Sequence, residues 1–481
     1  MYKDNFEKVN LTKEQENCVN FDSGDLLIKG VAGSGKSYVI LKRAIKLNNS
    51  KKPGETVAIF TYANSLVKYT DDLISSKAGV GAITVSTVDS YCMSLYYKIF
   101  KRSFYLGKDN QYRDLIKKTL EEHQKESQLN HRLYDVNISF FEDEFRWIRE
   151  KCITTMNDYL NADRKGRGSQ IRLSSKDKEF VWSLFAMFSR FARTERYKDW
   201  PDLYMELVLN LKLIPDEMKI DYILIDEAQD MTVGKLKVLK ALSKKTLTIA
   251  ADIAQKIYKT SFTWKEVGID ISGRSSKSLS KSFRSTKQIV ELAEDLMEIN
   301  RKNGVSDDYT EAVFPEKEGS KPRLVKFNSR IEEDEYLTRL LKEYPLNTEV
   351  IGVICRTRNE VYDMRKMLYR HGLESEIIDG KKKDEAKWSL LRPGIKLVVA
   401  HSSKGLEFER VIIPYLDDSE YPFKTYKVDE EQLGEYLQTE RSILYVAMTR
   451  AKSTLTMLCV NADSSRFIDE FNNNHYEMVS V

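Results

Sequence analysis

The string "GVAGSGKS" at positions 30–37 constrains this chain more than any other feature. It fits the pattern G-x-x-x-x-G-K-[ST], and it lies between a β-branched segment at 25–30 and a helical-looking segment. In such a phosphate loop, glycines let backbone N–H groups turn toward phosphate oxygens at a helix N-terminus. Lys36 is then expected to reach the β- and γ-phosphates, and Ser37 to offer its hydroxyl to Mg²⁺. The predicted nucleotide contacts are Gly30, Val31, Ala32, Gly33, Ser34, Gly35, Lys36 and Ser37.

A second segment supplies acidic groups. "YILIDEAQD" (222–230) is an apolar strand pattern that ends in two adjacent acids. Asp226, at the end of the strand, is suited to hold Mg²⁺, and Glu227 is suited to take a proton from an attacking water or to orient it. Together with the phosphate loop, this pair predicts Mg²⁺-dependent hydrolysis of a nucleoside triphosphate.

Short β-branched runs alternate with helical-looking segments along most of the chain. This βαβ pattern predicts parallel sheets covered by helices on both faces. Between Tyr91 and Pro215 the pattern changes, and charges and aromatics repeat at helical spacing, which predicts an all-helical insertion in the first sheet domain. The fold class is therefore α/β, with two sheet domains. Strands are expected at 25–30, 56–61, 82–85, 221–226, 247–251, 349–354, 395–400, 410–415 and 455–460.

The charge balance permits a nucleic-acid partner without requiring one. Lys and Arg number 77 against 73 Asp and Glu, a formal net charge of +4, and a groove can be basic while the total is near neutral. The five cysteines are scattered without CxxC spacing, so neither a disulfide framework nor a metal cage is expected. No apolar run approaches the roughly 18 residues of a membrane span. We expect a cytoplasmic protein with no membrane partner.

Four further motifs, in this order, resemble those of the UvrD/Rep-like superfamily 1A DNA helicases. They are "LTKEQ" (11–15), "SFRST" (282–286), "VVAHSSKGLEFERVIIP" (398–414) and "ERSILYVAMTRAK" (440–452). The resemblance covers nearly the whole chain. It implies ATP as the nucleotide, Mg²⁺ as its metal, and two RecA-like P-loop NTPase domains with the cleft between them as the site of hydrolysis.

The resemblance also implies a division of the chain. Residues 1–91 and 216–275 would form RecA-like domain 1A, which binds ATP; residues 92–215 would form the helical insertion 1B. Residues 276–481 would form RecA-like domain 2A. Only a little over a hundred residues separate Arg284 from His401, so the 2B subdomain of larger relatives is expected to be absent or minimal.

Carrying the family's roles over residue by residue gives the rest of the ATP site. Gln15 would read the adenine and Phe283 would contact it, while Glu407 would face the ribose or brace the nearby loops. Gln255 would sense the γ-phosphate.

Two arginines complete the predicted catalytic set. Arg284 and Arg450 would neutralise the charge that develops on the transferred phosphoryl group, a role worth roughly 10³ to 10⁵ in rate in other NTPases. The catalytic set is then Lys36, Glu227, Gln255, Arg284 and Arg450.

Nucleic-acid contacts follow from the same resemblance. Tyr258, together with either Phe262 or Trp264, would stack on unpaired bases, and the two later aromatics remain alternatives. Hydroxyls, amides and cations suit sequence-independent contacts to sugar and phosphate. The residues expected to make them are Thr61, Asn64, Thr87, Ser90, His401 and Lys404.

The resemblance implies an ATP-dependent translocase and helicase on single-stranded or tailed duplex DNA, moving 3′ to 5′. An alternative is a DNA-stimulated ATPase motor subunit of a nuclease or phage-defence complex that unwinds little alone; a repair partner would also fit. A further alternative, from another class, is a nucleotide-sensing module with an inactive site.

Overall fold

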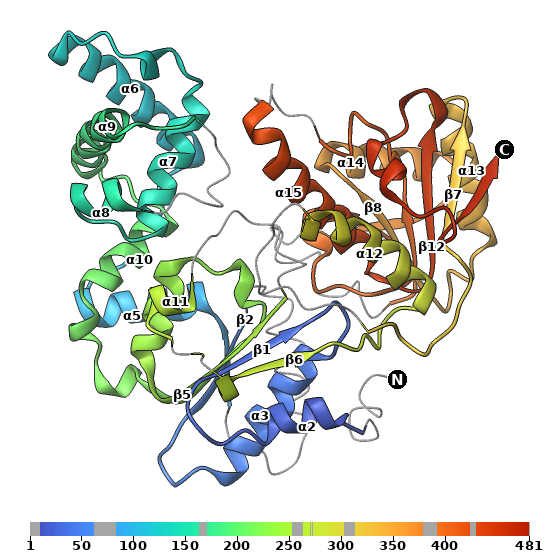
Figure 1. Ribbon diagram of the computed structural model, residues 1–481, viewed down its shortest axis with the longest axis horizontal. Coiled ribbons are helices and arrows are strands. Elements are labelled where there is room, and N and C mark those ends of the chain that lie inside the picture. The colour runs from blue at the N-terminus through green and yellow to red at the C-terminus, as the bar shows by residue number, and fades with distance from the viewer. Residues whose placement is uncertain are drawn as a thin grey trace.

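The computed structural model describes residues 10–61, 83–162, 171–252, 263–269, 271, 273–302, 313–378, 392–423 and 430–480. Four predicted site residues, Asn64, Gln255, Tyr258 and Phe262, lie outside these ranges. The described chain forms two parallel β-sheets and a group of helices that extends from the first sheet (Figure 1).

The first sheet has the strand order β3-β2-β4-β5-β1-β6, and every pairing in it is parallel. Its strands are rich in Val, Ile and Leu, and two hydrophobic clusters cover its two faces, as expected for a parallel sheet buried on both sides. The strands are β1 (Leu26–Gly30), β2 (Val57–Thr61), β3 (Thr84–Thr87), β4 (Ile220–Ile225), β5 (Ser243–Ala251) and β6 (Ser276–Leu279). Its helices include α2 (Lys13–Val19), α3 (Lys36–Ser50), α5 (Val88–Phe100) and α11 (Val233–Leu242).

Between β3 and β4 the described residues contain helices and no strand. These helices bury a cluster of aromatic side chains of their own, because their apolar residues recur at helical spacing. The helices after α5 are α6 (Asp109–Ser127), α7 (Ile138–Glu150), α8 (Met156–Asn161), α9 (Ser175–Thr194) and α10 (Trp200–Leu209).

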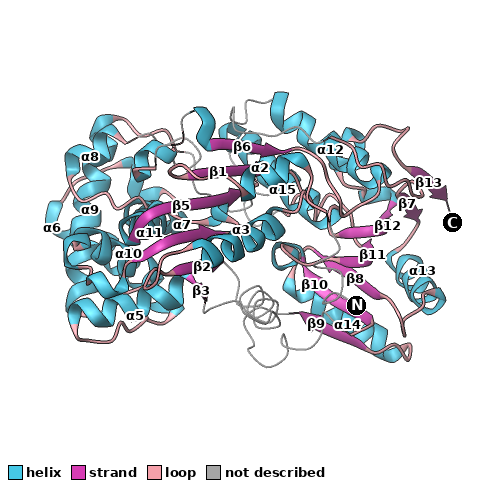
Figure 2. Cartoon of the chain, turned by 90° about the horizontal axis from the view of Figure 1, so that it is seen from below, coloured by secondary structure: helices cyan, strands magenta, loops and turns pink. Residues whose placement is uncertain are grey.

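The second sheet has the order β13-β7-β12-β11-β8-β10-β9, again with parallel pairings. The strands are β7 (Arg323–Phe327), β8 (Val350–Cys355), β9 (Ser375–Ile378), β10 (Gly394–Val399), β11 (Phe408–Ile413), β12 (Ala451–Val460) and β13 (Glu477–Ser480). The helices are α12 (Lys287–Lys302), α13 (Arg330–Glu343), α14 (Arg358–Arg370) and α15 (Glu430–Met448). Figure 2 shows the strands of the two sheets as two separate groups.

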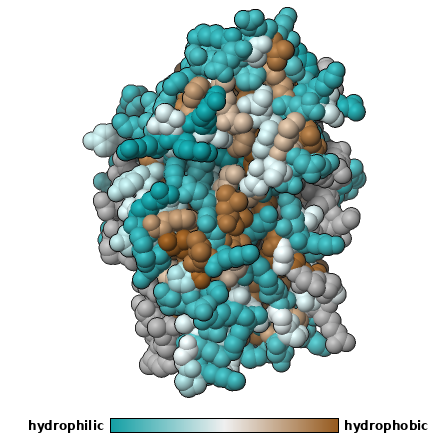
Figure 3. All heavy atoms as spheres, turned by 90° about the vertical axis from the view of Figure 1, so that its left-hand side faces the viewer, coloured by the Kyte–Doolittle hydropathy of each residue, from teal (hydrophilic) through white to brown (hydrophobic). Residues whose placement is uncertain are grey.

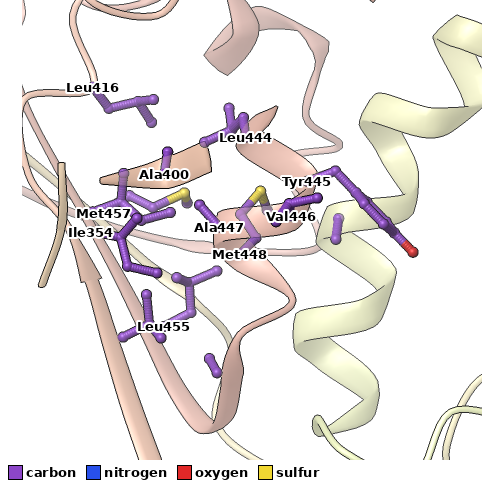
Figure 4. Packing of buried hydrophobic residues seen from close by; sticks show 14 of the residues in the cluster. Ile354, Ala400, Leu416, Leu444, Tyr445, Val446, Ala447, Met448, Leu455 and Met457 are labelled. Carbon is purple, nitrogen blue, oxygen red and sulfur yellow. The ribbon is translucent and has the colours of Figure 1, made fainter. Parts of the chain in front are cut away.

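Helix α15 contributes the apolar end of its sequence to the core of the second sheet. Leu444, Val446 and Met448 are fully buried and lie among side chains of β8 and β12, such as Ile354 and Met457 (Figure 4). The next residues of the chain are Thr449 and Arg450, so this packing fixes where the predicted catalytic arginine emerges.

The sequence missed strands where the usual pattern is weak. β6, with the polar sequence "SKSL", begins just past the predicted domain boundary at 275/276, yet it pairs with β1 in the first sheet. The first sheet therefore extends to Leu279, because a backbone ladder can form with few apolar side chains. β7, β9 and β13 were also not expected.

The described residues between Arg284 and His401 form α12, β7, α13, β8, α14, β9 and β10, elements that belong to the second sheet or pack on it. Within the ranges that the structure describes, no helix is long and apolar enough to cross a membrane.

The parallel strands of the first sheet end at a common edge, where ligands bind in open α/β sheets. Gly30 ends β1 and Thr61 ends β2, while Asp226 and Asp252 directly follow β4 and β5. This edge carries the predicted nucleotide site.

Candidate nucleotide site and nucleic-acid interface

The phosphate loop connects β1 to α3 in the conformation that its glycines permit. Gly33 has φ +72°, and Gly35, the N-cap of α3, has φ +81°. Both lie in the left-handed region, which glycine adopts without a Cβ penalty. The first N–H groups of α3 have no partner within the helix and form an anion-binding terminus. The loop therefore fits the phosphates of a nucleotide.

Lys36 lies inside this loop and is only 8% exposed. Its Nζ donates to the backbone oxygens of Gly30 (2.9 Å) and Val31 (2.8 Å) and to Oδ2 of Asp252 (2.9 Å). Asp252 is buried at the end of β5 and was missed by the sequence reasoning, although an acid after an apolar strand is the same signal that identified Asp226. The Asp252 carboxylate and the two backbone oxygens thus hold the ammonium group of Lys36 beside the phosphate loop.

Asp226 and Glu227 are adjacent, yet their environments shift their pKa values in opposite directions. Burial raises the pKa of Asp226 to about 6, and the charge of Glu227 adds to this, while a hydrogen bond with Ser37 opposes it. The pKa of Glu227 is lowered: burial would raise it, but the charges of Lys404 and Lys36 and the amide of Gln229 (2.6 Å) prevail. Opposite shifts in neighbouring groups are typical of catalytic sites.

The chemistry of Ser37 and Asp226 fits Mg²⁺. Both supply oxygen, and Mg²⁺ is usually bound by one or two protein oxygens together with phosphates and water. The described residues contain no group of three or more His, Cys, Asp or Glu side chains that could hold a metal by themselves.

The segment 282–284 of the second unit lies directly against the phosphate loop. The N–H of Phe283 donates to the carbonyl of Gly33 (2.9 Å), and a Cβ built on Gly33 would lie 2.7 Å from Cβ of Arg284. Arg284 donates from Nε to Glu407 Oε1 (2.8 Å), and Glu407 also pairs with Lys452 (3.2 Å). Although burial opposes it, these two cations lower the pKa of Glu407 to about 2.

Arg450 is 1% exposed and lies close to the same charges. It donates from Nε to the Val446 carbonyl (2.8 Å) and from Nη2 to Thr449 Oγ1 (3.1 Å). Burial, followed by the charge of Arg284, lowers the pKa of Arg450, and Glu227 is the largest opposing influence. The structure thus brings Arg284, Arg450, Glu227 and Lys36 to one place.

The predicted adenine contacts have different surroundings. Gln15 is buried; its Nε2 donates to the Ser34 carbonyl (3.0 Å), and its Oε1 accepts from the N–H of Thr12 (3.0 Å). It therefore links the cap of α2 to the phosphate loop. Phe283 is 47% exposed, and Lys281 Nζ lies over its ring, 5.8 Å from the centroid. Adenine binding by both residues stays a prediction.

Lys404, predicted to contact DNA, bridges the two sheets. Its Nζ lies 2.5 Å from Asp230 Oδ2 and 3.6 Å from Glu227 Oε2, and its side chain is only 10% exposed. Lys404 follows η8 (Ala400–Ser403) in the second unit, whereas both acids follow β4 in the first. Lys404 therefore links Glu227, the candidate catalytic acid, to the segment of the second unit that is expected to contact the DNA strand.

Three other predicted DNA contacts lie at the edge of the first sheet. Thr61 is buried, and its Oγ1 has no hydrogen-bond partner among the described residues. Thr87 caps α5 by accepting from Ser90 N (3.2 Å), and the Ser90 side chain is exposed. Asp89, an acid beside these residues, pairs with Lys235 (2.7 Å). This pair offsets the charge that would oppose phosphate binding.

His401 lies beside Arg356, whose Nη1 is 3.4 Å from His401 Nδ1. Arg356 is held by both carboxylate oxygens of Glu440 on α15 (3.0 and 2.6 Å). Burial, with the charge of Arg356 added, lowers the pKa of His401 to about 4. His401 is therefore neutral at physiological pH.

Trp264 begins the 3₁₀ helix η6 (Trp264–Val267) and is partly buried against a core of the first sheet. This packing limits the ring surface left for a base. Tyr258, Phe262, Gln255 and Asn64 lie outside the described residues, so their predicted roles stay predictions.

Comparison with known proteins agrees with this geometry. Residues 11–265 match the sequence model of the UvrD/REP helicase N-terminal domain, and residues 278–383 and 380–462 match that of the UvrD-like helicase C-terminal domain. The chain belongs to the UvrD/REP helicase family. Its two sheets are the two α/β units of that family, and the predicted fold class is confirmed in this respect.

Several curated members of the UvrD/REP family are similar to the chain. A probable DNA helicase of Mycoplasma pneumoniae is 23% identical, covering 97% of this chain and 88% of its own length. The ATP-dependent DNA helicases PcrA of Staphylococcus epidermidis and Staphylococcus aureus are 22% and 21% identical over 84% of this chain, which spans 55% of their length. The solved C-terminal domain of a possible DNA helicase from Lactobacillus plantarum is 21% identical over 41% of the chain, with a TM-score of 0.30.

Proposed function

We propose that this chain is an ATP-driven translocase and helicase that moves 3′ to 5′ along single-stranded DNA. ATP would be hydrolysed in the cleft between the two sheets, and the substrates would be single-stranded or tailed duplex DNA. We further propose residues 1–91 and 216–275 as domain 1A, 92–215 as insertion 1B and 276–481 as domain 2A, with β6 added to the sheet of 1A.

One observation carries this proposal. The groups that we assign to phosphate binding and water activation come from the first sheet, and Arg284 and Arg450, which lie near them, come from the second unit. A site divided between two units is complete only when both are in place, so its chemistry depends on their relative position. Such a dependence is what a motor requires.

We assign separate roles in ATP hydrolysis to the residues of the site. Lys36 and the loop amides would bind phosphate oxygens, while Ser37 and Asp226 would hold the Mg²⁺ that neutralises them. Glu227, kept ionised by Lys404 and Lys36, would accept a proton from the attacking water or orient it.

Arg284 and Arg450 would stabilise charge developing on the transferred group. In this role, Arg284 would bind phosphate oxygens in place of the Glu407 carboxylate, so that one anionic partner replaces another. Gln255, outside the described residues, would complete the catalytic set.

The ATPase rate with single-stranded DNA, duplex DNA and RNA, measured at one stated salt concentration, tests the activity. Salt must be fixed because binding to phosphates releases counterions and weakens steeply as salt rises. We expect the largest stimulation by single-stranded DNA. Negligible turnover with every nucleic acid would refute the proposal.

Direction needs a separate experiment. Duplexes with only a 3′ tail or only a 5′ tail, of identical sequence and tail length, are offered with ATP, and strand separation is followed. We expect unwinding of the 3′-tailed substrate. Preference for the 5′ tail would reverse the proposed polarity while leaving the ATPase assignment intact.

A further inference from the structure

Two segments far apart in the sequence form one basic surface rich in exposed aromatics. We call residues 97–108 and 190–200 the basic-aromatic surface. The two segments contain eight basic and two acidic residues, a net charge of +6 in a chain whose total is +4. The chain's excess of positive charge is therefore concentrated here, outside the nucleotide site.

Specific contacts hold the two segments side by side. The N–H of Gly107 donates to the Lys198 carbonyl (2.7 Å), and Lys198 Nζ lies 5.3 Å from the ring centroid of Phe104. A Cβ on Gly107 would lie 2.3 Å from the Tyr197 ring, so the close approach requires glycine. The fold thus brings together two segments that are far apart in the sequence and forms this surface from them.

The acidic groups of this surface are engaged with partners, while most of its basic groups are exposed. Asp199 binds the buried Arg149 (2.6 Å), and Glu195 binds Lys118 (2.6 Å). Glu206, on neighbouring α10, binds Lys198 and lies 3.7 Å from Arg102, which is still 63% exposed. Seven of the eight basic side chains are exposed: Lys98, Lys101, Arg102, Lys108, Arg190, Arg193 and Arg196.

Large aromatic side chains are exposed among these cations. Tyr105 is 78% exposed, Tyr97 is 55% exposed and Trp200 is 39% exposed. Figure 3 shows the side of the molecule on which α5, α9 and α10 lie in Figure 1, where hydrophilic and hydrophobic side chains are mixed. Cations combined with accessible rings match single-stranded nucleic acid, whose backbone is anionic and whose bases stack on aromatics without sequence preference.

Helix α5 connects this surface to the predicted DNA track. Its exposed residues Ser90, Ser94, Tyr97 and Lys98 share one face of the helix, because Ser94 lies four residues after Ser90, and Tyr97 and Lys98 lie three and four residues after Ser94. Ser90 is a predicted DNA contact, and Tyr97 is seven residues further on, about 10 Å along the axis. A DNA strand that leaves the predicted DNA contacts at the start of α5 could follow this face of the helix to the basic-aromatic surface.

We propose that the basic-aromatic surface is a second binding site for single-stranded nucleic acid, which holds the strand beyond the segment bound in the cleft. This inference rests on the proposed function, because it assumes that the cleft binds a single strand. It adds a site that would set how affinity depends on strand length.

Binding of single strands of about 8, 16 and 24 nucleotides, lengths around common site sizes, tests the proposal by fluorescence anisotropy at several salt concentrations. Wild-type affinity should rise with length. In the variants Tyr105→Ala and Lys98→Ala/Arg102→Ala, the gain between the short and long strands should fall by at least about 5-fold, in keeping with the loss of one stacked base or two phosphate contacts. The short strand should bind and stimulate ATPase as in wild type.

The matched control is Arg339→Ala/Lys342→Ala, which removes two exposed cations from α13 and changes the net charge equally. It should keep the full length dependence. A plot of log affinity against log salt has a negative slope, and for Lys98→Ala/Arg102→Ala this slope should become less steep by about 1.4, at about 0.7 per lost contact. This change is expected with the long strand only.

An unchanged length dependence in both surface variants would overturn the inference, and so would a loss seen with duplex but not with single strands. Absence of binding by the wild type to any strand would instead refute the proposed function itself. The two failures are therefore distinguishable.

Discussion

At the scale of single residues, the site is defined by charges that are buried in pairs. Lys36 and Asp252 come from positions 216 residues apart and meet at 2.9 Å with almost no exposure. Removing one member of a buried pair of this kind is costly, because the other loses its nearest opposite charge.

We predict that Lys36→Ala abolishes ATP hydrolysis, lowering the rate by at least about 10²-fold because a donor to the transferred phosphate is lost. It should also lower the free energy of unfolding, by up to about 3 kcal/mol, since the buried Asp252 loses the ammonium group that lies 2.9 Å away. The double variant Lys36→Ala/Asp252→Asn should recover most of that stability and stay inactive. Denaturant unfolding and ATPase assays together check this; recovered activity in the double variant would contradict the role given to Lys36.

His401 predicts a pH dependence of stability. Its pKa is about 4 in the folded chain and about 6.5 when unfolded, so the unfolded state binds more protons between these values. Stability that depends on neutral His401 is present above about pH 6.5 and is lost as pH falls toward 4, by at most about 3 kcal/mol.

The measurement is unfolding of wild type and His401→Gln from pH 7.5 to 4. The difference in stability between the two should change steadily below pH 6.5, because only the wild type carries this titrating group. A constant difference across the range would show that His401 is not held neutral.

At the scale of elements, the close approach of the phosphate loop to the segment 282–284 is decisive. Gly33 leaves no space for a side chain, because its added Cβ would meet Arg284 Cβ at 2.7 Å and Ser282 Oγ at 2.8 Å. The loop and the arginine segment are thus fitted to each other.

We predict that Gly33→Ala lowers the ATPase rate by about 10²-fold, the effect of misplacing reacting groups by about 1 Å. Gly54→Ala is the matched control: its φ of +86° imposes similar backbone strain, but nothing lies within 4 Å of its added Cβ. It should lose about 1 kcal/mol of stability and keep its activity. Equal loss of activity in both variants would assign the effect to backbone strain.

At the scale of the whole molecule, Lys404 couples the two sheets. It joins η8 of the second unit to Asp230 and Glu227 of the first across the candidate catalytic site. The same cation keeps Glu227 ionised, so the position of one unit affects the chemistry of the other. In the described part of the chain, we find no feature that favours a motor subunit dependent on a nuclease.

We predict that Lys404→Met and Asp230→Asn are not additive. A double-mutant cycle on the free energy of unfolding should give a coupling of about 1–3 kcal/mol, as for residues that share a buried ion pair. Lys404→Met should also reduce stimulation of the ATPase by single-stranded DNA. Additivity within about 0.5 kcal/mol would show that the two units are not linked through this pair.

The two-sheet α/β class and the residues of the phosphate loop and of the acidic strand end could be predicted from the amino-acid sequence alone. These are local signals. Apolar strands are recognised from their composition, and a glycine-rich turn before a helix is typical of phosphate binding. Strands such as β6 escaped because pairing with β1 depends on backbone groups that every residue carries.

Which charges face each other is known only from the folded chain. No local pattern in the sequence shows that Asp252 meets Lys36 or that Lys404 meets Asp230, since each pair joins residues more than 170 positions apart. The basic-aromatic surface has the same origin, because its two segments become one surface only when Gly107 meets Lys198. Strand pairing and helix packing place such groups together, and burial then sets their charge and their chemistry.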